Sequence, residues 1–152
     1  MKKTIQYKDG YKHQGQGDHC YLSRLRPIRS IDESFYSITK EGWVWGYHGY
    51  AWDGASGPTK DSLWTKRASY FHDIGCQAIG EGLLDPEDRA EVDQMFYDIL
   101  LIDLEADNPK PILKRLRKIR AWYWYRGVRL GAKTSKLDPT TYHITITAPD
   151  YE

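Results

Sequence analysis

The stretch ASYFHDIGCQAIG, from Ala68 to Gly80, has the pattern of a helix that carries a histidine among apolar residues. Ala68, His72, Gly75 and Ile79 are spaced by four, three and four residues, which places them on one face of an α-helix. An imidazole on an apolar face costs free energy unless a hydrogen-bonding partner reaches it. The stretch therefore predicts a partner for His72 elsewhere in the chain.

A second helix, predicted to begin at Asp85, supplies that partner. Asp85 suits the N-cap and Pro86 the first helical position, and a core-facing stripe follows at Val92, Met95, Phe96, Ile99 and Leu100. Asp93 falls at the rim of this stripe. Because the connection is short, we predict an antiparallel helical hairpin in which Asp93 hydrogen-bonds His72, and in which Gly75 allows close approach. This bond would fix the ring tautomer and leave the other ring nitrogen free as a base.

The neighbouring residue Asp73 is available for a metal ion, because it lies about 100° around the helix from His72. Upstream, the loop GYAWDGASGP carries Asp53 and Gly54. Glycines allow backbone carbonyls to turn inward, and calcium takes six to eight oxygen ligands. These residues predict a calcium site formed by Asp73, Asp53 and loop carbonyls such as that of Gly54. The alternative for Asp53 is a turn cap within a glycine-rich loop.

The rest of the chain predicts an α+β fold. Residues 1–52 are mainly strands, with alternating segments at His19–Leu25, Ser34–Thr39 and Trp43–Trp52 and a turn at Lys40–Gly42. Residues 61–127 are mainly helices, the first of which starts near Asp61 or Ser62. Residues 141–147 alternate again. We expect a single domain whose antiparallel N-terminal sheet is joined by this C-terminal strand, with a three-helix segment inserted before it.

Composition bounds the possible location of the protein. With 152 residues, 40% hydrophobic residues and 28% charged residues, the chain has the composition of a globular domain. Two cysteines make no disulfide framework, and no signal peptide or 18-residue apolar run is present. These features predict a protein made and kept in a cytoplasm.

Charge is distributed unevenly between the second and third predicted helices. Asp85–Asp107 holds nine acidic residues, whereas Lys110–Lys136 holds ten basic residues and no acidic one. The third helix is predicted from Pro111 to Arg126, ending at Gly127, with an inward-facing apolar stripe of Ile112, Leu113, Leu116, Ile119, Trp122 and Tyr123. The alternatives are a surface for nucleic acid or anionic lipid, and an intramolecular contact with the acidic helix that leaves no surface for a partner.

Three motifs together resemble an uncharacterised family of phage and prophage proteins. They are WDGASGP, ASYFHD and RAEVDQMFY, and the similarity extends from Tyr47 to the closing YRGVRLG at Gly131. The shared features are a D-G-A-S-x-P loop, an H-D helix and a later aspartate followed by an aromatic residue. The resemblance implies a phage protein, located in the host-cell cytoplasm or in a virion, but no particular reaction.

The arrangement is also similar to the site of secreted phospholipase A-two. A glycine loop, an H-D pair and an aspartate 21 residues later recur there, as does R-x-x-x-D-x-x-F, here Arg89, Asp93 and Phe96. This resemblance implies a calcium-dependent hydrolase of an ester or lipid. His72 would activate water, Asp93 would orient its ring, and Asp73 with loop carbonyls would hold calcium.

The competing hypothesis is a non-enzymatic phage protein. It would be a virion component or an inhibitor of a host system that binds a protein or polyanion. In that case His72, Asp73 and Asp93 would form a structural network.

Overall fold

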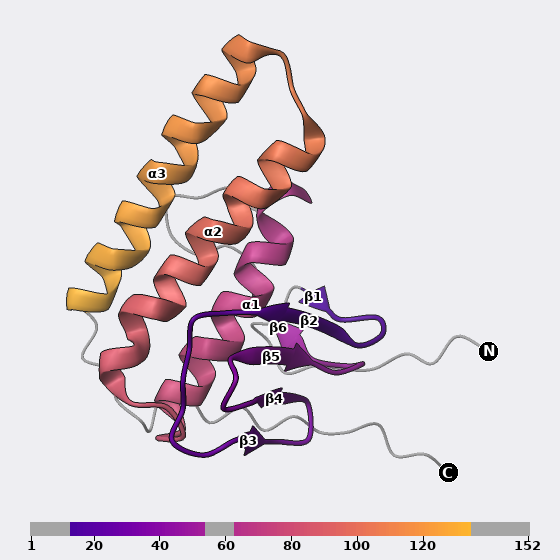
Figure 1. The fold of residues 1–152 in the computed structure, drawn as a ribbon, viewed down its shortest axis with the longest axis vertical. Coiled ribbons are helices and arrows are strands. Elements are labelled where there is room, and N and C mark those ends of the chain that lie inside the picture. The colour runs from indigo at the N-terminus through magenta and orange to yellow at the C-terminus, as the bar shows by residue number, and fades with distance from the viewer. Residues whose placement is uncertain (1–12, 54–62, 135–152) are drawn as a thin grey trace.

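The structure, a computed structural model, describes residues 13–53 and 63–134. This part of the chain has the predicted α+β fold, in which antiparallel sheets pack beside three α-helices (Figure 1). Helix α1 (Leu63–Gly80) contacts strand β5 and also α2 (Arg89–Asp107), and α2 contacts α3 (Pro111–Thr134). The helices thus form successive layers, and α3 is the layer farthest from the sheet.

The larger sheet has four strands in the order β2-β5-β4-β3. Their bounds are β2 His19–Leu22, β3 Ile31–Asp32, β4 Tyr36–Ile38 and β5 Trp43–Gly46. The predicted turn between β4 and β5 is confirmed. Gly42 adopts a φ of +95°, which favours glycine, and its N–H donates to the Thr39 carbonyl over 2.9 Å.

The predicted single strand Trp43–Trp52 is wrong, because the chain turns in its middle. Strand β5 ends at Gly46, and β6 (Ala51–Trp52) pairs with β1 (His13–Gln14) in a separate two-stranded sheet. The turn includes Gly49 at a φ of +92°, and the Tyr50 N–H donates to the Tyr47 carbonyl. Aromatic residues lie on both sides of this turn, because both sides contribute to the core. The sequence therefore has the pattern of one continuous strand.

Helix α1 is positioned on the sheet by a close contact with β5. A Cβ atom at Gly46 would lie 2.0 Å from the hydroxyl oxygen of Tyr70, so only glycine fits beneath that ring. Tyr70 also makes edge-on contacts with Tyr50 and Phe71. These buried aromatic residues fix α1 on the sheet and direct the next turn of the helix, with His72, toward α2.

The helical hairpin follows the predicted order, with a different first turn. Asp85 caps as predicted, since its carboxylate accepts the Glu87 N–H over 2.9 Å. The turn that follows is a short 3₁₀ helix, η1 (Pro86–Asp88), and α2 begins only at Arg89. At the other end of α1, Gly82 adopts a φ of +74° and stops the helix.

Helix α3 departs from the prediction in two ways. It continues past Gly127 to Thr134, because a mid-helix glycine costs only about 1 kcal/mol and Val128 packs against the core. The predicted inward stripe is also wrong, since all six of its residues are exposed, Ile112 to 79%. The inward face instead holds Ala121 and Trp124, both buried.

Ion pairs explain which side of α3 faces inward. Lys114 lies 2.5 Å and Lys118 3.4 Å from carboxylate oxygens of Glu105, and Arg117 pairs with Asp107 at the end of α2. The predicted contact between the basic and acidic helices is therefore present. This contact leaves part of the surface of α3 open to solvent, including the apolar stripe.

Three predicted features lie outside the described residues. They are the returning strand at 141–147, the helix start at Asp61 or Ser62, and the loop from Gly54 to Pro58.

Candidate functional site

His72 and Asp93 meet within the contact between α1 and α2. Nε2 of His72 lies 2.7 Å from Oδ1 of Asp93. A carboxylate only accepts, so Nε2 donates, and in the neutral ring Nδ1 is then the acceptor nitrogen. The helices approach closely because a Cβ atom at Gly75 would lie 2.7 Å from both methyl groups of Val92. The predicted hydrogen bond and the predicted role of Gly75 are both present.

Asp93 is fully buried and is held by all three helices. Besides His72 of α1, Oδ1 accepts from Nε of Arg89 of α2 over 2.8 Å, and Oδ2 accepts from Nη1 of Arg129 of α3 over 3.0 Å. Burial raises the pKa of Asp93, but His72 and Arg89 outweigh it, so the pKa lies below its usual value. The carboxylate is therefore charged and fixed at neutral pH.

The opposite side of the His72 ring faces Asp73 and Cys76. Oδ1 of Asp73 lies 3.7 Å from Nδ1. The Cys76 sulfur lies 3.7 Å from Nδ1 and 3.8 Å from Nε2, so it is in line with neither nitrogen. An edge-on contact with Phe96 closes another side of the ring. Asp73 and Cys76 are thus both neighbours of Nδ1, at the same distance.

The pKa of His72 is raised well above its usual value. Burial of the ring lowers the pKa, but Cys76 and the carboxylates of Asp73 and Asp93 outweigh that effect. The site therefore stabilises an imidazolium ion. Below this raised pKa the ring is an imidazolium ion, with Nε2 donating to Asp93 and Nδ1 lying 3.7 Å from Asp73, and only above it is Nδ1 free to accept a proton.

Asp73 and Asp53 come together at the edge of the site. The pKa of Asp73 is raised above its usual value. Burial is the main cause and the charge of Asp53 adds to it, whereas His72 opposes the rise. The backbone N–H of Asp53, which follows β6, also donates to the Asp73 carboxylate. Asp53 is thus near enough for its charge to raise the pKa of Asp73, whereas Gly54 lies outside the described residues. Among residues 13–53 and 63–134, no three His, Cys, Asp or Glu side chains form a metal-binding group.

Sequence reasoning gave Arg129 no role, although the residue lies in the YRGVRLG motif. Its partner Asp93 is 36 residues away, and no spacing rule connects them. Arg89, whose spacing allows either an i,i+4 pair with Asp93 or a surface position, pairs with Asp93 over 2.8 Å.

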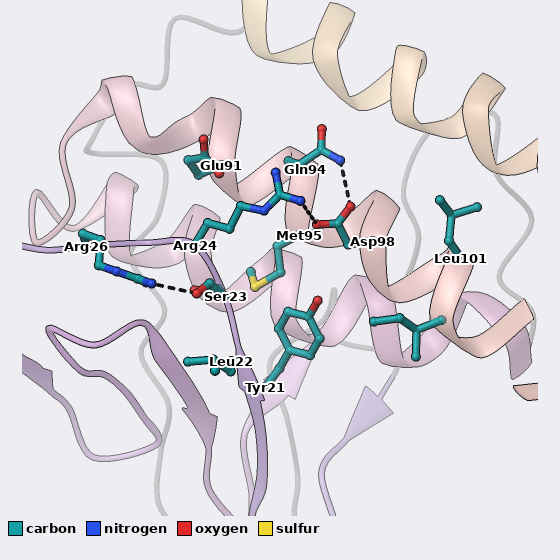
Figure 2. Close-up of a pocket in the computed structure, with 11 residues that line it drawn as sticks. Tyr21, Leu22, Ser23, Arg24, Arg26, Glu91, Gln94, Met95, Asp98 and Leu101 are labelled. Carbon is teal, nitrogen blue, oxygen red and sulfur yellow. Dashed lines mark hydrogen bonds and ion pairs between the residues drawn. The ribbon is translucent and has the colours of Figure 1, made fainter. Parts of the chain in front are cut away.

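A separate cavity of about 480 Å³ lies between the end of β2 and α2 (Figure 2). Its apolar wall includes Tyr21 and Met95, and across its rim Arg24 reaches Asp98, which also accepts from Gln94. None of the predicted site residues line it. The His72–Asp93 pair and this cavity thus involve different residues of α2.

Comparison with protein-family models, curated proteins and solved structures finds no match to this chain. The resemblances to a phage family and to phospholipase A-two therefore stay predictions. Within the described ranges, no helix combines the length and apolar character needed to cross a membrane.

Proposed function

We propose that this chain is a phage-type, calcium-assisted hydrolase of an ester or lipid. The observation that carries the proposal is the 2.7 Å hydrogen bond between His72 and the fully buried Asp93. Two arginines hold Asp93, so its direction toward Nε2 is fixed. A fixed acceptor at one ring nitrogen leaves the other as the base, as in other oriented histidine–carboxylate pairs.

In this proposal His72 acts in its neutral form, above its raised pKa: Nδ1 removes a proton from water, and Asp93 stabilises the imidazolium ion that forms. Asp73 and Asp53 would hold calcium, with loop carbonyls such as that of Gly54 completing the ligands. Two neighbouring carboxylates, one of them raising the pKa of the other, are a fitting donor set for a hard cation. When bound, calcium would supply polarisation of the substrate carbonyl or phosphoryl oxygen.

Hydrolysis of phospholipid vesicles and of a short-chain ester tests the proposal, with calcium and with chelator. His72→Asn and His72→Gln remove the base and are expected to lower the rate at least about a hundredfold. Asp73→Asn is expected to lower calcium affinity and rate together. The matched control is Asp103→Asn, the same change in an aspartate that pairs with Arg67 on the surface.

Thermal melts of each variant separate chemistry from folding. Calcium is expected to raise the melting temperature of the wild type and of Asp103→Asn, but not of Asp73→Asn. The hydrolase proposal fails if the wild type hydrolyses neither substrate and calcium leaves its melting temperature unchanged.

The second candidate is a non-enzymatic phage protein, a virion component or an inhibitor of a host system. The outer face of α3 favours it. Exposed basic residues and exposed apolar residues alternate along that helix, which is unusual for a face without a partner. In this case the His72 network would have a purely structural role, and α3 would bind a protein or a polyanion such as nucleic acid or anionic lipid.

A further inference from the structure

Helix α3 has an apolar seam on the side that faces away from the rest of the protein. Ile112, Leu116, Ile119 and Tyr123 are exposed by between 57% and 79%. Their spacing of four, three and four residues continues through Arg126 to Leu130. This 3.5-residue repeat is the pattern of a coiled-coil interface, and it extends over about 27 Å of helix.

The opposite side of α3 already has its contacts. Ala121 and Trp124 are buried, and Arg129 reaches Asp93 at the centre of the helical layers. The seam is therefore not the face of α3 that packs against the core. It is a second apolar face on a helix whose first face is packed.

The flanks of the seam are basic on both sides. Arg115 lies on one side and Arg120 on the other, both exposed, and Arg126 interrupts the seam itself. The helix contains no acidic residue. Residues beside the seam of a coiled coil select the partner by charge.

These charges exclude a second copy of this chain as the favoured occupant. Two copies of α3 would bring arginines against arginines along both flanks, whichever way they ran. A membrane surface fits less well, because the charged Arg126 lies within the exposed apolar face, between Trp122 and Ile119 on the helical wheel.

We propose that α3 docks an amphipathic helix of another protein, one with an apolar seam flanked by acidic residues. The partner helix would span about five turns, matching Ile112 to Leu130. Its apolar residues would pack between those of α3, and its carboxylates would pair with Arg115, Arg120 and Arg126. This proposal is independent of the hydrolase site and names the partner chemistry for the binding alternative.

The test uses the full chain and two synthetic helical peptides of about four heptads. Both have leucine at the seam positions; one has glutamate at the flanking positions and the other lysine. Fluorescence anisotropy is expected to show binding of the glutamate peptide at least about tenfold tighter than the lysine peptide, with affinity falling as salt rises.

Three variants locate the binding. Ile119→Ser and Arg120→Glu are each expected to weaken binding of the glutamate peptide at least about tenfold. Ile102→Ser is the control, because Ile102 is a similarly exposed isoleucine, 48% accessible, on α2. All three residues are on the surface, so the melting temperatures should stay close to that of the wild type.

Several outcomes would overturn the proposal. They are equal binding of the two peptides, no binding of either, or binding that Ile119→Ser leaves unchanged. Sedimentation showing a dimer that Ile119→Ser dissolves would assign the seam to a second copy. Binding to anionic vesicles but not to the glutamate peptide would assign it to a membrane surface.

Discussion

The two sides of α2 are packed by different physical means. Toward α1, a glycine allows the helices into close contact around a buried hydrogen bond between Asp93 and His72. Toward the first turns of α3, Lys114 and Arg117 pair with partly exposed carboxylates at the acidic end of α2. Exposed pairs contribute little, whereas removing one partner of a buried network is costly. The difference teaches that buried contacts hold α1 on α2, whereas the first turns of α3 are held more weakly.

The largest test of this difference is Asp93→Ala. It leaves Arg89 and Arg129 facing a buried position without a carboxylate, and we expect it to lower the free energy of unfolding by about 3–5 kcal/mol. Asp103→Ala, which removes only the surface pair with Arg67, should cost about 0.2–1 kcal/mol. Urea denaturation measures both. Similar losses for the two variants would remove the distinction between buried and exposed ion pairs of α2.

Acid should weaken the same network in a predictable window. The groups facing Asp93 are His72 of α1, Arg89 of α2 and Arg129 of α3, and its pKa is lowered from 3.8. A lowered folded-state pKa contributes stability above the unfolded value and loses it as pH falls through the folded value. The stability gap between wild type and Asp93→Asn should therefore be present at pH 7 and narrow below about pH 4. A gap that stays constant down to pH 2 would contradict this.

Gly75→Ala tests the close approach of α1 and α2. The added methyl group would meet both methyl groups of Val92, and overpacking of this kind costs about 1–3 kcal/mol. Adding Val92→Ala removes those methyl groups, so the double variant should lose less than the sum of the two single changes. Strict additivity in thermal or urea unfolding would show that the contact is not tight.

Gly127→Ala makes the corresponding change in α3, where we expect the free energy of unfolding to rise instead of fall. An added Cβ atom there meets no atom within 4 Å. Alanine should therefore raise the free energy of unfolding by about 0.5–1 kcal/mol through helix propensity alone. A loss of stability in this variant would show that another part of the protein packs closely against Gly127.

The smallest effect is expected at the ion pairs between α2 and α3. Glu105→Gln removes the partner of both Lys114 and Lys118. A slight loss of stability at low ionic strength should disappear at high salt, because exposed pairs are screened. Melting curves at the two salt concentrations check this, and a loss that persists in salt would show that the pairs are shielded from solvent.

The same contrast explains what the sequence could predict. The α1–α2 contact was predictable because its determinants lie in local patterns: a helical stripe containing His72 and Gly75, and Asp93 at the rim of another. The packing of α3 was not, because its apolar residues form two stripes and local periodicity cannot choose between them. The choice depends on contacts with α2, including the 36-residue link from Arg129 to Asp93. The break within Trp43–Trp52 was missed for a similar reason, since it depends on pairing with β1.

The position of Asp93 also bears on how the native state fluctuates. One buried carboxylate receives a donor from each of the three helices, so none of them can separate from the others without exposing or orphaning that charge. Amide protons around His72, Asp93 and Arg129 should consequently exchange with solvent through one shared opening event. The first turns of α3, which are far along the helix from Arg129, are free to open by smaller and more frequent fluctuations.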